Sequence, residues 1–389
     1  MTKLYIIRHT EAEGNLYRRM QGVTDGTVTD LGLRQIEALR ERFREVHIDA
    51  VYSSDLYRTM MTATAVCLPK GLPLHLDSRL REINVGPWED TAFGTTRYEN
   101  PEKMRLFNEE TCKWSLAGAD TIQSLGARGI GALREIAEKN PGKSVAVVSH
   151  SYIISSMLCG LFYGYENFNQ LGRSYNTAVS LLEYEDGAFR PVFIHDASHL
   201  EGKNLFRKRW TDADGLSELR FEPLTDIDMY IRCRRDAWKV VYGEEKMADF
   251  NGSGFWMDAQ QTVGPDPQAM VSAYLGTAHA GMLQLSPDRE KDKKIGYIPF
   301  VYLRESFRHK GLGIQLIGHA SWFYRRLGRE KLQLSVSPGN RNAIAFYEKY
   351  GFVHTGRHKG RYGNLLLMEK DIRIPQPPKE MRLIREGEA

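Results

Sequence analysis

The sequence predicts an α/β protein of two domains. Its 389 residues exceed one ordinary domain. Roughly the first 200 residues alternate short apolar runs with helical stretches, which indicates a largely parallel sheet covered by helices. The second half follows a different pattern, and neither half repeats the other.

Strands and helices of the first half follow from local patterns. Apolar runs at 4–7, 50–52 and 145–148 are typical of strands buried on both faces. Thr29 can cap a helix whose apolar face carries Leu33, Ile36, Leu39 and Phe43. Further patterns predict a helix after 53–55, a helix over 121–139 that Pro141 and Gly142 end, and strands over 177–183 and 189–194.

The second half begins after a mixed-charge stretch at 204–217, which we interpret as a linker between a domain at 1–203 and one at 218–373. The elements expected there are helices at 226–242, after Gly311 and at 342–350, and strands at 269–277, 294–303 and 332–336. The tail at 374–389 is Pro-rich and then charged, which predicts an extended, weakly ordered end.

Composition narrows the class of protein. The chain is 42% hydrophobic and 26% charged, as in soluble globular proteins, and 53 basic against 49 acidic residues leave +4, too little for a dedicated nucleic-acid binder. Four widely spaced cysteines predict free thiols in the cytoplasm. No apolar run approaches the roughly 18 residues that span a bilayer, so we expect no membrane partner and no secretory signal.

Two clusters of polar residues are interpreted as having no catalytic role. His195 and His199 stand four residues apart but have no third ligand in view, so we expect no metal site. The basic cluster 207–209 lies in the linker and is interpreted as a solvated run, with an anionic partner as the alternative.

Chemistry-bearing residues follow the predicted strands of the first half. Arg8 and His9 come directly after the first strand, at the sheet edge where ligands bind in open α/β folds. A neutral imidazole can attack phosphorus, and an arginine fork neutralises the phosphate. Arg58 and His150 follow two other strands, while Glu82 beside an apolar turn is a candidate general acid.

The order of these residues resembles the histidine phosphatase superfamily over residues 1 to about 203. The matching segments are RHTEAEGN, QGVTDGTVTDLGLRQ, SSDLYRTMMTA, the LREINVG–WE segment and VVSHS. The resemblance implies a phosphoglycerate mutase-like three-layer α/β/α sandwich, with His9 as the phosphorylated nucleophile and Glu82 protonating the departing oxygen. The other positions that it assigns to the catalytic phosphate pocket are Arg8, Asn15, Gln21, Arg58 and His150.

One departure and one short segment qualify this resemblance. Thr10 stands where many relatives carry Gly. The stretch between Glu82 and Val145 is too short for the large insert of true mutases, which favours hydrolysis of a small-molecule phosphoester over phosphoryl return to the substrate.

A second chemical pattern follows the strand at 294–303. Arg308, Gly311 and Gly313 lie between this strand and a helix, where glycines let backbone N–H groups and the helix start face a pyrophosphate. With the later segment NRNAIAFYEKYGF, this resembles the GNAT N-acetyltransferase family over about 218–372, a mixed α/β fold that uses acetyl-CoA.

This second resemblance also implies roles. The backbone of Val301 and Leu303 would bind pantetheine, and Asn340 would lie beside the cofactor. The pyrophosphate would be held by Arg308, His309, Lys310, Gly311, Leu312 and Gly313. Tyr347 is either the proton donor to the departing thiolate or a core residue, and Glu305 is either a general base or a solvated carboxylate. We expect Phe346 and Phe352 to pack in the core.

Together these patterns predict a bifunctional enzyme that hydrolyses phosphomonoesters and transfers acetyl groups to an amine, with no metal. Two alternatives remain open. One is a phosphomutase fused to an acetyltransferase, which phosphate release would distinguish. The other is a regulatory protein whose second half only binds its ligand.

Overall fold

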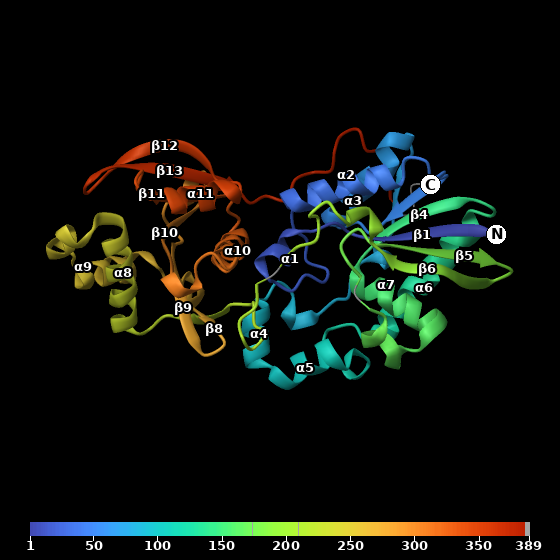
Figure 1. The fold of residues 1–389 in the computed structure, drawn as a ribbon, viewed down its shortest axis with the longest axis horizontal. Helices are drawn as coiled ribbons and strands as arrows, with labels where there is room; N and C mark the ends of the chain where they lie inside the picture. The colour runs from blue at the N-terminus through green and yellow to red at the C-terminus, as the bar shows by residue number, and fades with distance from the viewer. Residues whose placement is uncertain (173, 209, 386–389) are drawn as a thin grey trace. The chain divides into compact units, whose positions relative to one another are not determined.

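The computed structural model describes residues 1–172, 174–208 and 210–385, and the chain divides into two compact units (Figure 1). The first unit takes the described residues of 1–91, 99–208 and 374–385, and the second takes 92–98 and 210–373. The first unit therefore runs past residue 203 and includes part of the tail. The domain ranges inferred from the sequence stay a proposal.

The first unit contains a seven-stranded sheet in the order β14-β3-β2-β4-β1-β5-β6. Its strands are β1 (Thr2–Arg8), β2 (Ala50–Ser53), β3 (Leu74–Leu76), β4 (Ser144–Ser149), β5 (Val179–Glu185), β6 (Ala188–Asp196) and β14 (Leu383–Ile384). The pairs from β14 to β1 are parallel, whereas β5 and β6 are antiparallel additions. The largely parallel sheet is confirmed.

Helices cover both faces of this sheet, with α2 and α3 on one side and α6 and α7 on the other (Figure 1). The helices are α1 (Glu13–Tyr17), α2 (Asp30–Arg42), α3 (Tyr57–Lys70), α5 (Pro101–Glu109), α6 (Ile122–Lys139) and α7 (Ser151–Leu158). Thr29 caps α2 by accepting a hydrogen bond from the Gly32 N–H. Ile36 and Leu39 point into the core, but Leu33 is 48% exposed, so its assignment to the apolar face was wrong.

The tail differs from its prediction as an extended, weakly ordered end. Met381 is only 6% exposed and belongs to the core cluster that α2 and α3 form with the sheet. The next residues form β14, which pairs in parallel with β3, and the Leu74 N–H donates to the Arg382 carbonyl at 2.8 Å. Burial of Met381 and pairing at an otherwise open sheet edge explain the order.

The second unit is built on a mixed sheet in the order β12-β13-β11-β10-β9-β8-β7. Its strands are β7 (Arg220–Pro223), β8 (Met270–Leu275), β9 (Ala278–Ser286), β10 (Ile295–Leu303), β11 (Lys331–Val336), β12 (Val353–Gly360) and β13 (Gly363–Asp371). β10 and β11 are parallel, and the other pairs are antiparallel. β8, β10 and β11 were predicted, whereas β7, β9 and the β12–β13 hairpin were missed.

The helices of the second unit match the three that the sequence predicts and add two. They are α4 (Phe93–Glu99, mostly in this unit), α8 (Ile227–Tyr242), α9 (Gly252–Thr262), α10 (Gly313–Arg326) and α11 (Arg341–Lys349). Asp226 caps α8 through the Met229 N–H. Among the described residues, no helix combines the length and apolar character that crossing a membrane requires.

Candidate active site

Two histidines meet at the carboxyl ends of β1 and β4. His9 follows β1 and His150 follows β4, and the His9 N–H donates to the Ser149 carbonyl at 2.9 Å, which joins the two strand ends. The imidazole centroids are 5.2 Å apart, and the side chains are 5% and 0% exposed. The parallel pairing of β1 with β4 thus brings together two residues that are 141 positions apart in the sequence.

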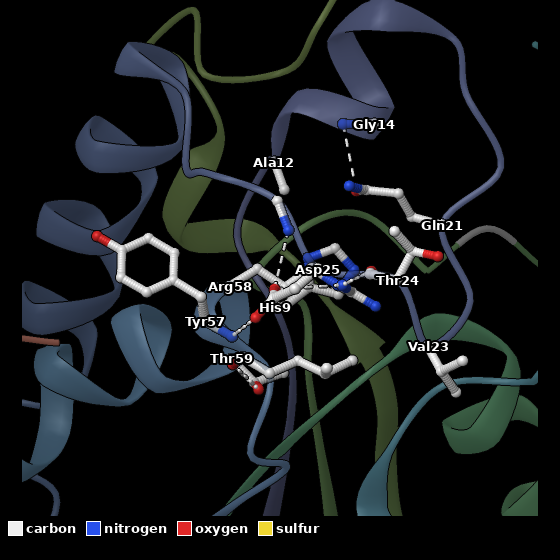
Figure 2. A network of polar contacts seen from close by, with 12 residues as sticks. His9, Ala12, Gly14, Gln21, Val23, Thr24, Asp25, Tyr57, Arg58 and Thr59 are labelled. Atoms are coloured by element: carbon white, nitrogen blue, oxygen red, sulfur yellow. Dashed lines mark hydrogen bonds and ion pairs between the residues drawn. The ribbon is translucent and has the colours of Figure 1, made fainter. Parts of the chain in front are cut away.

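Arg58 lies in the first turn of α3, beside His9 and Thr24 in Figure 2, and is 1% exposed. Its guanidinium donates to the backbone carbonyls of Thr24 at 2.9 Å and Gly22 at 2.6 Å, and lies 3.8 Å from Asp25. These contacts fix the guanidinium in the loop that follows α1. Burial lowers the pKa of Arg58. A bound anion would have the opposite effect, because it stabilises the charged guanidinium.

Arg8 approaches the same histidines from the end of β1. It is half-buried, and its guanidinium donates to the Ser174 carbonyl. Its charge contributes to the lowered pKa of both His9 and His150. The backbone carbonyl of His9 accepts a hydrogen bond from the Asn176 amide at 3.0 Å, so the segment around 174–177 holds both residues.

The surroundings of His9 and His150 favour the neutral form of both imidazoles. Burial holds the pKa of His9 well below its ordinary value of 6.5, and the charges of Arg58 and Arg8 lower it further. The same causes lower the pKa of His150. Nδ1 of His9 lies 2.6 Å from the Thr10 carbonyl, which can only accept, so Nδ1 carries the proton and Nε2 keeps its lone pair.

His150 has a polar atom available for a ligand. Its Nε2 lies 3.0 Å from Oγ of Ser54. Its Nδ1 is buried and has no hydrogen-bond partner within the part of the chain that the structure describes. A buried imidazole nitrogen without a partner is costly unless a ligand satisfies it, so its surroundings fit a phosphoryl oxygen.

Glu82 is 5% exposed and lies in the loop after β3, with its carboxyl group against the first turn of α7. It accepts backbone N–H bonds from Ile83 at 3.0 Å, Tyr152 at 3.2 Å and Ile153 at 3.1 Å. Burial raises its pKa from 4.5, and these bonds with the Arg58 charge only partly oppose the effect. A raised pKa favours the protonated form, which a general acid needs.

Asn15 lies in α1 and Gln21 in the loop after it, and both side chains accept backbone N–H bonds from the segment that follows His9. The Asn15 side-chain oxygen accepts the Ala12 N–H at 3.1 Å. The Gln21 side-chain oxygen accepts the Gly14 N–H at 3.2 Å (Figure 2). Sequence reasoning missed Ser54 and Asn176, which contact His150 and His9. Ser54 stands within a motif segment and offered a signal, whereas Asn176 did not.

The second unit opens a gap between two parallel strands. The β10–β11 ladder runs from Ile295 to Ile298, but β10 continues to Leu303 and β11 to Val336. Val301 and Leu303 lie on the part of β10 that β11 does not pair, and such a strand edge can bind the amides of a pantetheine arm. The Leu303 carbonyl already accepts a bond from Arg308 Nε at 2.9 Å.

The loop between β10 and α10 has the backbone of an anion cradle. His309 has φ +61 and Gly311 has φ +73, both in the left-handed region, and Gly313 is the first residue of α10. Lys310 donates to the Ser306 carbonyl at 2.6 Å, which braces the loop. Leu312 is 1% exposed, so its side chain packs in the core beneath the loop. These residues fit a pyrophosphate at a helix start.

The α11 residues lie next to this cradle. A Cβ added to Gly313 would come within 3.1 Å of the Phe346 ring. Asn340 caps α11 through the Ala343 N–H at 3.2 Å. Tyr347 is half-buried and packs against Phe352, and burial raises the pKa of its phenol, which keeps it protonated.

The expected core role is confirmed for one of two aromatic residues. Phe352 is 2% exposed, but Phe346 is half-buried beside the cradle, so its assignment to the core was wrong. Its neighbours on a short, surface-lying helix leave it partly open. Glu305 is exposed.

His199 and Arg207, one residue from each of the two remaining clusters, have defined partners. Both ring nitrogens of His199 are engaged, by Arg42 at 3.1 Å and Thr177 at 2.9 Å, and burial lowers its pKa to about 4. Over the described ranges, no group of three or more His, Cys, Asp or Glu is arranged to hold a metal. Arg207 was wrongly assigned to a solvated run, because it pairs with the buried Glu11; Arg209 lies outside the described residues.

Comparison with known proteins confirms both family resemblances. Residues 4–197 match the histidine phosphatase superfamily (branch 1), and residues 228–352 match the acetyltransferase (GNAT) family; both families are enzymes. The chain is 32% identical over 161 residues to phosphoserine phosphatase 1 of Hydrogenobacter thermophilus, covering 41% of this chain and 76% of that protein.

Two further proteins are similar to the first unit. A probable phosphoglycerate mutase, GpmB, of Yersinia pestis is 29% identical over 186 residues, which cover 48% of this chain and 86% of that protein. The solved structure of Bacillus stearothermophilus YhfR is 27% identical, with a TM-score of 0.50. The match covers 52% of this chain and 100% of the YhfR chain.

Proposed function

The chain belongs to the histidine phosphatase superfamily, and from this premise we propose that its first unit hydrolyses phosphomonoesters through a phosphohistidine at His9. The observation that carries the proposal is the state of the His9 ring. Its Nδ1 is tied to the Thr10 carbonyl and its pKa is lowered, so a neutral Nε2 is ready to attack among cationic groups.

In the first step, Nε2 of His9 forms a bond to phosphorus while the P–O bond to the leaving group breaks. Arg8, Arg58 and His150 bind the phosphoryl oxygens, and Glu82 gives its proton to the departing alkoxide. In the second step, the Glu82 carboxylate takes a proton from water, whose oxygen attacks phosphorus. The N–P bond breaks, inorganic phosphate leaves and His9 is regenerated.

Phosphoryl transfer between positions of one substrate is the second candidate, because one similar protein is named a probable phosphoglycerate mutase. We favour hydrolysis because the stretch from Glu82 to β4 is short and lacks room for a mutase insert. We assign small phosphoesters as the substrate class, in line with the phosphoserine phosphatase named above.

The GNAT domain implies the use of acetyl-CoA, which supplies an activated acetyl thioester. We propose that the β10 edge at Val301 and Leu303 binds the pantetheine arm and that the loop at 308–313 holds the pyrophosphate. Tyr347 would donate its phenolic proton to the departing thiolate, and Asn340 would fix the start of α11 beside the cradle. The acceptor is an amine, either a small molecule or a protein side chain.

The proposed compartment is the cytoplasm. All four cysteines are free thiols in the structure: Cys67, Cys112, Cys159 and Cys233. Three are buried, and burial raises the pKa of Cys67, Cys159 and Cys233 to about 11, which makes these thiols unreactive at neutral pH.

The decisive experiment replaces the nucleophile. His9→Ala should abolish phosphate release from a panel of phosphoesters, and rapid acid-free quenching of the wild type with ³²P-labelled substrate should trap an acid-labile phosphoenzyme. His47→Ala is the matched control, because its side chain is 81% exposed. Full phosphate release by His9→Ala would overturn the proposal. Coenzyme A release with a panel of amines tests the second activity in the same preparation.

A further inference from the structure

Two buried polar residues that need partners follow His9 directly in the loop between β1 and α1. Thr10 is 0% exposed and Glu11 1% exposed. A carboxylate buried to this degree is strongly destabilising unless an opposite charge or several donors satisfy it. Arg207, which is 196 positions away in the sequence, supplies the opposite charge to Glu11 through Nε of its guanidinium.

Gln35 of α2 joins the same two segments with one amide. Its Oε1 accepts the Glu11 N–H at 2.9 Å and the Thr10 hydroxyl at 3.1 Å. Its Nε2 donates to the Leu205 carbonyl at 2.9 Å. Gln35 is 3% exposed, so these bonds form away from water and fix the distance between the loop and the 205–207 segment.

The 205–207 segment is itself anchored. Leu205, 6% exposed, packs with Leu200 against Ala38 of α2. The ring of Phe206 lies 4.7 Å from that of Tyr175, edge to face. Tyr175 lies between the two residues, 174 and 176, that contact Arg8 and His9. The segment therefore touches the structures on both sides of the histidine.

We propose that residues 205–207 and Gln35 form a brace that positions His9, with Arg207 and Gln35 as positioning residues; this rests on the proposed hydrolysis. The connection runs from Arg207 through Glu11 to the Thr10 carbonyl, which holds the Nδ1 proton of His9. If the Thr10–Glu11 backbone moves, His9 loses the acceptor that sets its tautomer and ring orientation. The brace ends where the chain leaves the first unit.

Arg207→Ala tests the brace through kinetics. A misplaced nucleophile affects the chemical step more than binding, so kcat should fall by about 10-fold to 100-fold while KM changes little. Arg207→Lys keeps the charge and should restore part of the loss. In a double-mutant cycle, Glu11→Gln should remove most of the additional effect of Arg207→Ala. Lys208→Ala, at an exposed neighbouring position, should behave as the wild type.

A readout that does not require activity is the ¹⁵N shift of the His9 ring nitrogens. The wild type should show a single Nδ1–H tautomer, and Arg207→Ala should show a mixture at unchanged overall fold by circular dichroism. If the wild type releases no phosphate but the shifts respond, the proposed function fails and the brace stands. If Arg207→Ala matches the wild type in both kcat and ring shifts, the brace is refuted. If Arg207→Ala does not fold, Arg207→Lys and Gln35→Glu carry the same two measurements.

Discussion

Replacing Met381 with alanine should destabilise the first unit, although Met381 lies in the tail that follows the second unit. The side chain is 6% exposed within the cluster that α2 and α3 form on the sheet. The adjacent Leu383 also packs against this cluster, and β14 pairs with β3 for two residues. The tail therefore contributes both apolar burial and hydrogen bonds at a sheet edge.

The size of the effect follows from what the substitution removes. Met→Ala in a core costs about 2–5 kcal/mol, and a chain end that can relax places Met381 towards the lower value. For a unit of this size, about 2 kcal/mol lowers the melting temperature by roughly 4–8 °C. The loss cannot exceed the docking free energy of the tail, because beyond that point the tail simply detaches.

Hydrogen exchange is the sharpest assay, because it follows the peptides of the first unit separately from those of the second. The Leu74 N–H donates to the Arg382 carbonyl, so Met381→Ala should speed exchange in β3 peptides before it affects the second unit. Met257→Ala is the matched control, since Met257 is 63% exposed. Unchanged exchange in β3 and an unchanged melting temperature for Met381→Ala would refute the reasoning.

Three further outcomes are expected. Glu82→Gln should slow hydrolysis of an alkyl phosphate by about 10²–10⁴ but an activated aryl phosphate far less, and equal losses would contradict its role as an acid. The pH profile of kcat/KM should fall on the acid side as His9 becomes protonated, and this limb should lie below pH 6.5 because the pKa of His9 is lowered. It should fall on the alkaline side as Glu82 ionises, and this limb should lie above pH 4.5 because the pKa of Glu82 is raised. An optimum above pH 8 would contradict both assignments. Gly311→Val should weaken acetyl-CoA binding by about tenfold or more in calorimetry, whereas Gly328→Val, with a similar φ of +67 and equally open surroundings, controls for backbone strain alone.

Local patterns predicted those parts of the fold whose stability is local. The helix α2 begins where Thr29 caps it, and α6 begins after its cap Thr121, because a cap and an apolar stripe are readable within one turn. The strand ends that carry His9 and His150 were equally readable, since parallel strands place their carboxyl ends at one edge. The meeting of His9 and His150 could therefore be predicted from the sequence.

Contacts between distant segments of low apolar content were not readable. β14 is two residues long within a Pro-rich, charged tail, and nothing in its composition specifies β3 as a partner. Arg207 stands in a basic run that is ordinarily solvated, and its partner Glu11 gives no sign in sequence that it is buried. The β12–β13 hairpin was missed for a different reason. Most residues of β12 are polar and exposed, so the strand lacks the apolar alternation that would predict it.

The electrostatic design of the first site explains why both histidines are neutral before substrate binds. Arg8 and Arg58 place two positive charges beside them, and the nearest carboxylate to Arg58, Asp25, lies at 3.8 Å. Protonating His9 would place a buried charge beside these two positive charges, which explains why its pKa is lowered. A phosphate dianion reverses this balance, because it neutralises the guanidinium groups and favours positive charge on the imidazoles. Substrate binding should thus raise the pKa of His150 and let its ring donate to a phosphoryl oxygen. His9 should keep the lone pair on Nε2, because the proton of its neutral ring stays on Nδ1 in the hydrogen bond to the Thr10 carbonyl.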